Sequence, residues 1–346
     1  SMADALADSY ENSGLLDQNR ALLRAADEDV AQSLAALRPI VNWSANYSWT
    51  QADGSQGGVS FEDQVTRTGF FEVAASLLLY DGGASQFRTE AAKALVLQTR
   101  QQLIGIEQDV LLRAVTAYMN VRRNSEFVAL RNSNLRLIQE ELRAARDRFE
   151  VGEVTRTDVS LAEARLAATR SALAAAEGAL AQSIEEFRAA VGRAPGNLQV
   201  VSAAPVDRGP DAARAFAVQN HPSVKAAQQG VTAAELSIRA AEAALGPSIS
   251  LQGSVRLDDE ANSTERLGVS IGGPIYSGGQ LASAIRKAVA QRDSARAGLH
   301  VTGQSVAQSV GNAFAQLRVA RASSEASELQ IRAAETAFRG VREEAT

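Results

Sequence analysis

Apolar residues recur every seven positions along two stretches of the chain, on either side of the segment VGEVTRTDV at residues 151–159. The repeat positions are Val121, Val128, Leu135, Leu142 and Phe149 before this segment, and Val159, Leu166, Leu173, Leu180 and Phe187 after it. Such a repeat is typical of a coiled coil, and positions equidistant from Val154 meet if the two stretches fold back on each other. No proline between Pro39 and Pro195 interrupts the arms. The pattern predicts an antiparallel helical hairpin over about residues 84–190.

Elsewhere the apolar period changes to two, which is typical of strands with one polar and one apolar face. Strands are predicted at about residues 40–50, after Pro39, and at about 66–80, ending in the sequence YDGG at Tyr80. Residues 51–60, which contain glycine and glutamine, are predicted to form an exposed loop. A helix is expected before the first strand, over about residues 3–37.

The same order of elements returns later in the chain, which predicts an internal duplication. Pro39 matches Pro247 at an offset of 208, and YDGG at Tyr80 matches YSGG at Tyr276 at an offset of 196. The first repeat is expected at residues 1–194, a proline-containing connector at 195–211, and the second repeat at 212–346. The second repeat contains a helix, strands at about 248–258 and 266–276, and a long helix that is expected to stop before a second copy of the turn.

Composition narrows the function classes. The chain has 45% hydrophobic but only 5% aromatic residues, which favours thin, closely packed helices over one thick core. A net charge of −5 without long charged runs argues against a nucleic-acid partner. The absence of cysteine excludes disulfides, thiolate metal sites and cysteine catalysis. No run approaches the ~18 apolar residues of a membrane helix.

The sequence contains no pattern expected of an enzyme, a metal site or a cofactor site. Its two histidines, His221 and His300, stand alone, and capping or surface roles are favoured over metal ligation. The carboxylates are scattered along helical faces near arginines, as on the flanks of a coiled coil. No catalytic residue, metal ligand or cofactor is therefore assigned.

The two-faced strands have two interpretations. They form either a small soluble sheet that rests on a helix or part of a membrane barrel. The barrel is favoured because Trp43, Tyr47 and Trp49 suit a bilayer interface and the thin helices offer little cover. An open sheet in lipid leaves unpaired edges, so at least two chains must combine, and three would supply 12 strands around an aqueous lumen. The residues predicted to line that lumen are Asn42, Ser44, Asn46, Ser48, Ser250, Gln252, Ser254 and Arg256.

Four features of the sequence are shared with a known family. These are the duplicated order of helix, two strands and long hairpin, the prolines that precede the strands, the YDGG and YSGG exits, and the segment VGEVTRTDVSLAEARL. In these features the sequence resembles the TolC family of outer-membrane efflux and type I secretion channels. The resemblance implies a mainly α fold with β, in which coiled-coil helices cross the periplasm and four strands per chain complete a homotrimeric, 12-stranded barrel in outer-membrane lipid. It also implies an exit duct coupled to a periplasmic adaptor and an inner-membrane pump.

The turn at 151–159 carries the site predictions. Gly152 can adopt the positive φ of a reversal, and Thr157 or Asp158 could cap the second arm, which alone would explain the sequence. The resemblance implies adaptor contact at the turn and a gating ion pair at Asp158. In the family the arginine of that pair belongs to the second copy of the turn. Here Arg156 of a neighbouring subunit could replace it, and the alternative is that Arg156 is a solvated charge. The adaptor-contact residues are Val151, Gly152, Thr155 and Val159.

Two functional hypotheses follow. The first is a passive outer-membrane channel that opens at its periplasmic tip. The alternative is a soluble coiled-coil scaffold or periplasmic adaptor with a small β-domain. Dependence on detergent separates them, because a channel needs it once removed from membranes and a soluble scaffold does not.

Overall fold

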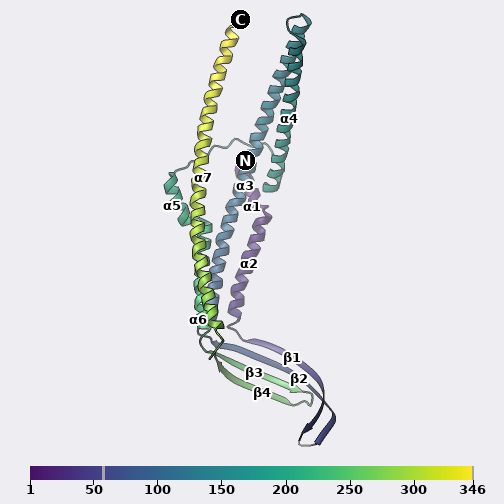
Figure 1. The fold of residues 1–346 in the computed structure, drawn as a ribbon, viewed down its shortest axis with the longest axis vertical. Coiled ribbons are helices and arrows are strands. Elements are labelled where there is room, and N and C mark those ends of the chain that lie inside the picture. Colours follow the sequence, from purple (N-terminus) through teal and green to yellow (C-terminus); the bar gives the residue numbers. More distant parts are fainter. Residues whose placement is uncertain (57–58, 345–346) are drawn as a thin grey trace. The chain divides into compact units, whose positions relative to one another are not determined.

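The computed structural model describes residues 1–56 and 59–344, with residues 52–56, 59–64 and 344 described by their backbone alone. It consists of long helices and one sheet (Figure 1). The elements are α1 (Met2–Glu11), α2 (Gly14–Ala35), β1 (Ile40–Gln56), β2 (Val59–Tyr80), α3 (Ala84–Glu150), α4 (Arg156–Val191), α5 (Pro210–Asn220), α6 (Pro222–Ala243), β3 (Ser248–Asp258), β4 (Ser263–Gly272) and α7 (Gln280–Glu344).

Contacts divide the chain into two compact units, residues 1–21 with 103–207 and residues 22–102 with 208–346. These units are not the two sequence repeats, because α2 and α3 each begin in one unit and end in the other. The division at residues 194 and 212 therefore stays a prediction about sequence symmetry.

The first unit contains the predicted hairpin, formed by the second part of α3 and by α4. Its seam is confirmed, since Val121, Leu142, Leu166 and Phe187 are all buried between the arms. Phe149 is 44% exposed, so the seam ends before the turn. Three ion pairs join the arms at 2.6 to 3.0 Å, and because their side chains are about half exposed each adds at most about 1 kcal/mol. Apolar packing therefore provides most of the stability of the hairpin.

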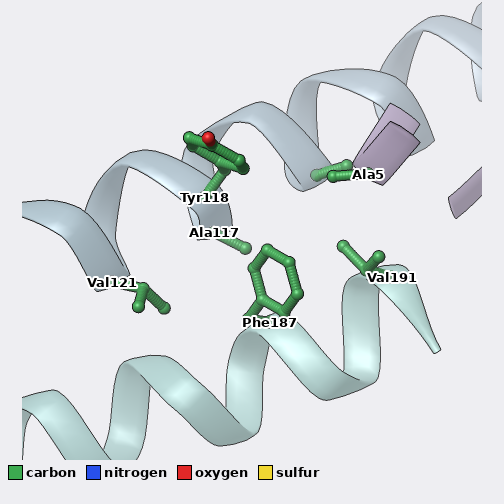
Figure 2. Close-up of a cluster of buried hydrophobic side chains, with 7 residues drawn as sticks. Ala5, Ala117, Tyr118, Val121, Phe187 and Val191 are labelled. Atoms are coloured by element: carbon green, nitrogen blue, oxygen red, sulfur yellow. The ribbon is translucent and has the colours of Figure 1, made fainter. Parts of the chain in front are cut away.

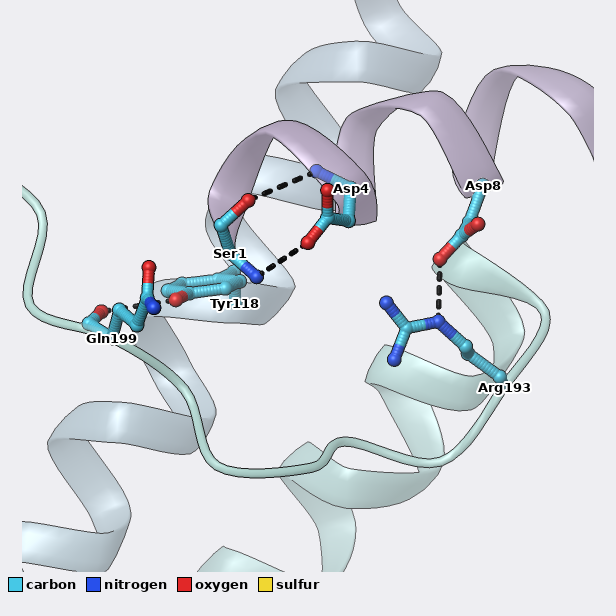
Figure 3. A network of polar contacts seen from close by, with 6 residues as sticks. All are labelled: Ser1, Asp4, Asp8, Tyr118, Arg193 and Gln199. Atoms are coloured by element: carbon cyan, nitrogen blue, oxygen red, sulfur yellow. Dashed lines mark hydrogen bonds and ion pairs between the residues drawn. The ribbon is translucent and has the colours of Figure 1, made fainter.

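The base of the hairpin is closed by α1 and by the segment that follows α4. Figure 2 shows the ring of Phe187 pointing between Ala117 and Val191, with its centroid 6.4 Å from that of Tyr118. The Tyr118 hydroxyl donates a hydrogen bond to the carbonyl of Gln199 at 2.9 Å, which fixes the connector (Figure 3). A hydrophobic cluster and a buried tyrosine thus hold four segments together.

The predicted single helix over residues 3–37 is wrong, because it is broken between α1 and α2. The side-chain amide of Asn12 donates to the carbonyl of Asp8 at 2.8 Å and ends α1. The Ser13 hydroxyl then accepts from the backbone N–H of Leu16 at the start of α2. Short polar side chains that bond their own backbone compete with helix continuation.

The second unit contains one antiparallel sheet in the order β1-β2-β3-β4. The predicted loop at 51–60 is wrong for the described part, because β1 continues to Gln56 and β2 begins at Val59, while residues 57–58 lie outside the described residues. Backbone pairing between the two strands extends them through this segment, although residues 51–56 lack the apolar alternation of the first part of β1. The fourth strand ends at Gly272, earlier than predicted, because Pro274 cannot donate a ladder hydrogen bond.

The joints between the sheet and the long helices repeat the same backbone conformation. Gly82 and Gly83 have φ of +68° and +86°, and Gly278 and Gly279 have φ of +60° and +85°. Residues with a side chain rarely adopt this region, so both joints require glycine. The YDGG and YSGG motifs therefore build matching strand-to-helix turns.

Asp81 adds hydrogen bonds at the first joint. Its carboxylate accepts from the N–H of Gly83 at 3.1 Å and from the N–H and hydroxyl of Ser85 at 2.7 and 2.6 Å. Burial alone would raise the pKa of Asp81, but the hydrogen bonds from Ser85 and Gly83 outweigh it and lower that pKa from its ordinary value of 3.8. The charged form of Asp81 thus stabilises the start of α3.

Beyond the sheet in this unit, α6 packs along α7. Arg296 on α7 pairs with Glu235 on α6 at 2.6 Å. The ring nitrogen Nδ1 of His221 accepts a hydrogen bond from the N–H of Ser223 at 3.2 Å, so this histidine caps α6. Pro222 at the first helical position suits the same helix start.

Candidate functional site: the sheet faces and the hairpin tip

The strand register places the predicted lumen residues on one face of the sheet. Antiparallel partners point to the same side, and residues two apart on a strand share a face. One row across the sheet pairs Asn42 with Ala74, then Ser254 and Arg266, and the next pairs Ser44 with Glu72, then Arg256 and Thr264. All eight residues belong to this polar face: Asn42, Ser44, Asn46, Ser48, Ser250, Gln252, Ser254 and Arg256.

Charged groups that the sequence reasoning did not assign also lie on the polar face. Glu72 stands directly across from Arg256, whose guanidinium carbon lies 3.7 Å from the centre of the Phe70 ring. Arg266 on β4 stands across from Ser254. Period-two alternation along β2 is enough to assign Glu72 to the polar face. The face of Arg266 could not be assigned in the same way, because the start of the fourth strand was predicted three residues too late and its pairing partners were unknown.

The opposite face of the sheet is apolar and exposed. Trp43 is 73% exposed, Leu267 82% and Ile271 70%. The other members of this face include Val41, Tyr47, Phe71, Val73, Leu251, Val255, Leu257 and Val269. An exposed apolar surface of this extent marks a contact with lipid or with another protein.

The two outer strands of the sheet are each paired on one side. In the described residues β1 pairs with β2 and β4 pairs with β3, so their other edges carry open backbone hydrogen-bonding groups. Such edges are templates for pairing with another chain.

The turn of the hairpin reverses the chain at Gly152, whose φ is +81° as predicted. Gly152 N–H donates to the carbonyl of Phe149 at 3.0 Å, and Glu153 N–H donates to that of Arg148 at 2.9 Å. These bonds satisfy carbonyls at the end of α3 that have no partner within the helix.

The cap of α4 differs from the predicted one, because Thr155 is its N-cap residue. The hydroxyl of Thr155 accepts from the N–H of Asp158 at 3.3 Å, and Asp158 Oδ2 accepts from the N–H and hydroxyl of Thr155 at 2.8 and 2.7 Å. Hydrogen bonds from the Thr155 side chain and backbone lower the pKa of Asp158. This reciprocal arrangement is a capping box.

The other predicted tip residues differ in their accessibility. Val151 is 71% exposed, whereas Val159 packs partly against the cluster of Leu142 and Leu166 within the hairpin. Arg156 is exposed and forms no ion pair with any residue that the structure describes. The tip therefore presents Val151, Gly152 and Arg156 to the surroundings, and Val159 contributes to the hairpin itself.

The described residues contain no group of three or more His, Cys, Asp or Glu side chains that could hold a metal ion. Within the same residues, no helix has a stretch apolar enough and long enough to span a membrane.

Comparison with known proteins accounts for this combination of a two-faced sheet and long helices. A family model described as outer membrane efflux protein matches residues 5–193 and 215–345. The chain belongs to the outer membrane efflux protein family. Outer membrane efflux protein BepC of Brucella suis is 36% identical over 351 residues, which cover 99% of this chain and 75% of BepC. Outer membrane protein TolC of Vibrio cholerae is 25% identical, covering 83% of this chain and 68% of that protein.

Solved structures agree on the fold of this efflux family member. The open state of the Neisseria gonorrhoeae MtrE outer membrane channel matches with a TM-score of 0.73 at 21% identity, covering 91% of this chain and 72% of MtrE. The resemblance to the TolC family and the mainly α fold with β are confirmed.

The protein is an outer-membrane channel of efflux or type I secretion systems, with its helices in the periplasm. The family assignment replaces the soluble scaffold alternative. Members of this family are components of transport systems. That this protein has no enzymatic activity stays a prediction.

Proposed function

We propose that three copies of this chain close one 12-stranded barrel around the polar face of the sheet and act together as a passive exit duct. The observation that supports this proposal is the strand register, which puts the eight polar residues on one face of the sheet and the exposed apolar residues on the other. Four strands per chain and a threefold assembly give 12 strands, enough for an aqueous lumen. The open edges of β1 and β4 pair between copies, since lipid cannot satisfy them.

The apolar face has the height that this role requires. On β3 it extends from Ile249 to Leu257, which are eight residue steps apart. At about 3.3 Å per step and a tilt of about 40°, the strand rises roughly 20 Å. Outer-membrane barrels carry an apolar band about 25 Å tall.

Neighbouring positions on β3 provide the test of this arrangement. The chain has no cysteine, so Ser254→Cys and Val255→Cys each introduce a single thiol for a fluorescent label. In vesicles that contain brominated lipid, the label at 255 should be quenched and the label at 254 should not. Equal quenching at the two positions would contradict the barrel.

The hairpin tip is proposed as the end at which a periplasmic adaptor and an inner-membrane pump open the duct. Val151, Gly152 and Thr155 are exposed there and are the proposed adaptor contacts, and Val159 supports the same surface from within the hairpin. Asp158 and Arg156 are the proposed gating residues. Oδ2 of Asp158 is held by Thr155, so a partner on a neighbouring copy would have to engage Oδ1.

Single-channel recording separates gating from capping at this tip. Asp158→Asn removes both the charge and the full strength of the cap, whereas Thr155→Val removes the hydroxyl of the cap and keeps the charge of Asp158. An intersubunit ion pair predicts a raised resting conductance for Asp158→Asn and for Arg156→Gln, with little change for Thr155→Val. If Thr155→Val raised the conductance as much as Asp158→Asn, Asp158 would act through the cap alone.

A further inference from the structure

We infer that Arg266 of the three copies forms a positive belt in the lumen, which attracts anionic groups of the exported solute. This inference rests on the proposed barrel. It assigns to one side chain a role in selecting solutes that bear carboxylate, sulfate or phosphate groups.

Arg266 lies on the polar face, and its neighbours within its own row are uncharged. Its row across the sheet consists of Asn42, Ala74 and Ser254. Arg266 is exposed and forms no ion pair with the part of the chain that the structure describes. It helps to line a hollow of the sheet together with two carboxylates, Glu72 and Glu265, and with Asn42, Ser76, Gln252 and Ser254. Glu72 belongs to the next row, across from Arg256, and Glu265 pairs with Val255 on the opposite face.

The second arginine of this face has its charge compensated. Arg256 stacks on the ring of Phe70, and Glu72 stands directly opposite it. Asp258, two residues further along β3, belongs to the same face. Arg256 is thus placed between two carboxylates, and Arg266 is the positive charge without an acidic neighbour in its own row.

The outer end of the face is acidic instead. Asp258, Asp259 and Glu260 form the turn between β3 and β4, where Asp258 accepts from the N–H groups of Glu260 and Asn262 at 3.1 and 2.7 Å. The Arg266 row lies nearer to the helices than this turn, because Arg266 pairs with Ser254 and the turn begins at Asp258. The lumen therefore has two charged levels of opposite sign.

The belt is close enough to the axis to act on a solute. Twelve strands spaced by about 4.8 Å and tilted by about 40° close at a radius of roughly 12 Å. The Debye length is about 10 Å at 0.1 M salt and about 30 Å at 0.01 M. Three charges placed at the wall, the weakest case, then change the ratio of anion to cation permeability about threefold at 0.1 M salt and about tenfold at 0.01 M.

The test is the reversal potential of the channel in a planar bilayer under a KCl gradient. Arg266→Gln should lower the ratio of chloride to potassium permeability about threefold at 0.1 M salt, and more at lower salt. Arg266→Lys should keep the ratio. Glu72→Gln should raise it, since it removes a negative charge from the same face.

The matched control is Arg67→Gln, which removes the same charge from the opposite face. Arg67 pairs with Trp49 and therefore points away from the polar face. Its loss should leave the permeability ratio unchanged. Two results would overturn the belt and leave the proposed function standing. One is an equal shift of the permeability ratio in Arg67→Gln and Arg266→Gln, and the other is an unchanged ratio in Arg266→Gln or in Glu72→Gln. If the protein formed no conducting pores even in the Asp158→Asn background, in which the proposed gate is released, the proposed function and the belt would both be overturned.

Discussion

Removing the carboxylate of Asp81 should loosen the start of α3. The carboxylate accepts three hydrogen bonds at 2.6 to 3.1 Å, from Gly83 and Ser85. Removal of a side chain that caps a helix costs about 0.5–2 kcal/mol. Because burial of Asp81 is partial and water can replace some of the bonds, we expect Asp81→Ala to cost about 1–2 kcal/mol.

The matched position in the second joint is Ser277, the residue that replaces Asp81 in the motif. Its backbone carbonyl accepts from the N–H of Gln280 at 3.0 Å, and its hydroxyl makes no bond of the Asp81 kind in the described residues. Ser277→Ala should therefore have little effect. The pair of variants separates the contribution of the carboxylate from that of the shared backbone turn.

The assay is hydrogen–deuterium exchange of the amides in the first turn of α3. A loss of about 1–2 kcal/mol accelerates exchange about 5- to 30-fold at Gly83 and Ser85. The folded-state pKa of Asp81 is lowered, so its stabilisation is present above pH ~4 and is lost as pH falls through that lowered pKa. Asp81→Asn should lack this pH step. Unchanged exchange in Asp81→Ala, or equal acceleration in Ser277→Ala, would show that the Asp81 carboxylate does not stabilise this joint.

Three further substitutions, two of them with a matched control, test the packing and the turns. Gly82→Ala should destabilise its joint more than Gly278→Ala does, as measured by local hydrogen–deuterium exchange. Both glycines have a positive φ, but a Cβ at position 82 would lie 3.0 Å from the carbonyl oxygen of Ala243, whereas a Cβ at position 278 would meet open space. Phe187→Ala should cost about 3–5 kcal/mol and expose the hairpin base to limited proteolysis, whereas Phe338→Ala, at a 70% exposed residue, should not. Thr155→Ala should cost about 1 kcal/mol and increase fraying of the first turn of α4, which exchange at its amides would report.

The hairpin was predictable because its signal is periodic over many turns. Leu142 and Leu166 are buried as the repeat requires, since a seven-residue period leaves few other ways to cover the apolar stripe. Phe149 departs from the pattern, because it is 44% exposed although it occupies a repeat position. The strand faces were predictable for the same reason, since a period of two assigns each side chain to one side.

The features that the sequence did not predict depend on single hydrogen bonds or on register. The break after α1 rests on the hydrogen bond of the Asn12 amide. The N-cap of α4 is Thr155, and residue type alone does not distinguish it from Thr157 or Asp158, which are equally suitable N-cap residues. The extension of β1 and β2 rests on backbone pairing of residues 51–56 with residues on β2, which the period of apolar side chains does not report. Arg266 was missed because its face is known only once Ser254 is known to be its partner.

Electron cryo-microscopy of the protein in lipid nanodiscs would test the proposed trimeric barrel. We expect a ring of three chains in which β1 of each copy pairs with β4 of the next, with Asn42, Ser254 and Arg266 facing the lumen and Trp43 and Leu267 facing lipid. A sheet that closes within one chain, or one whose polar face points toward lipid, would show that the proposed barrel is wrong.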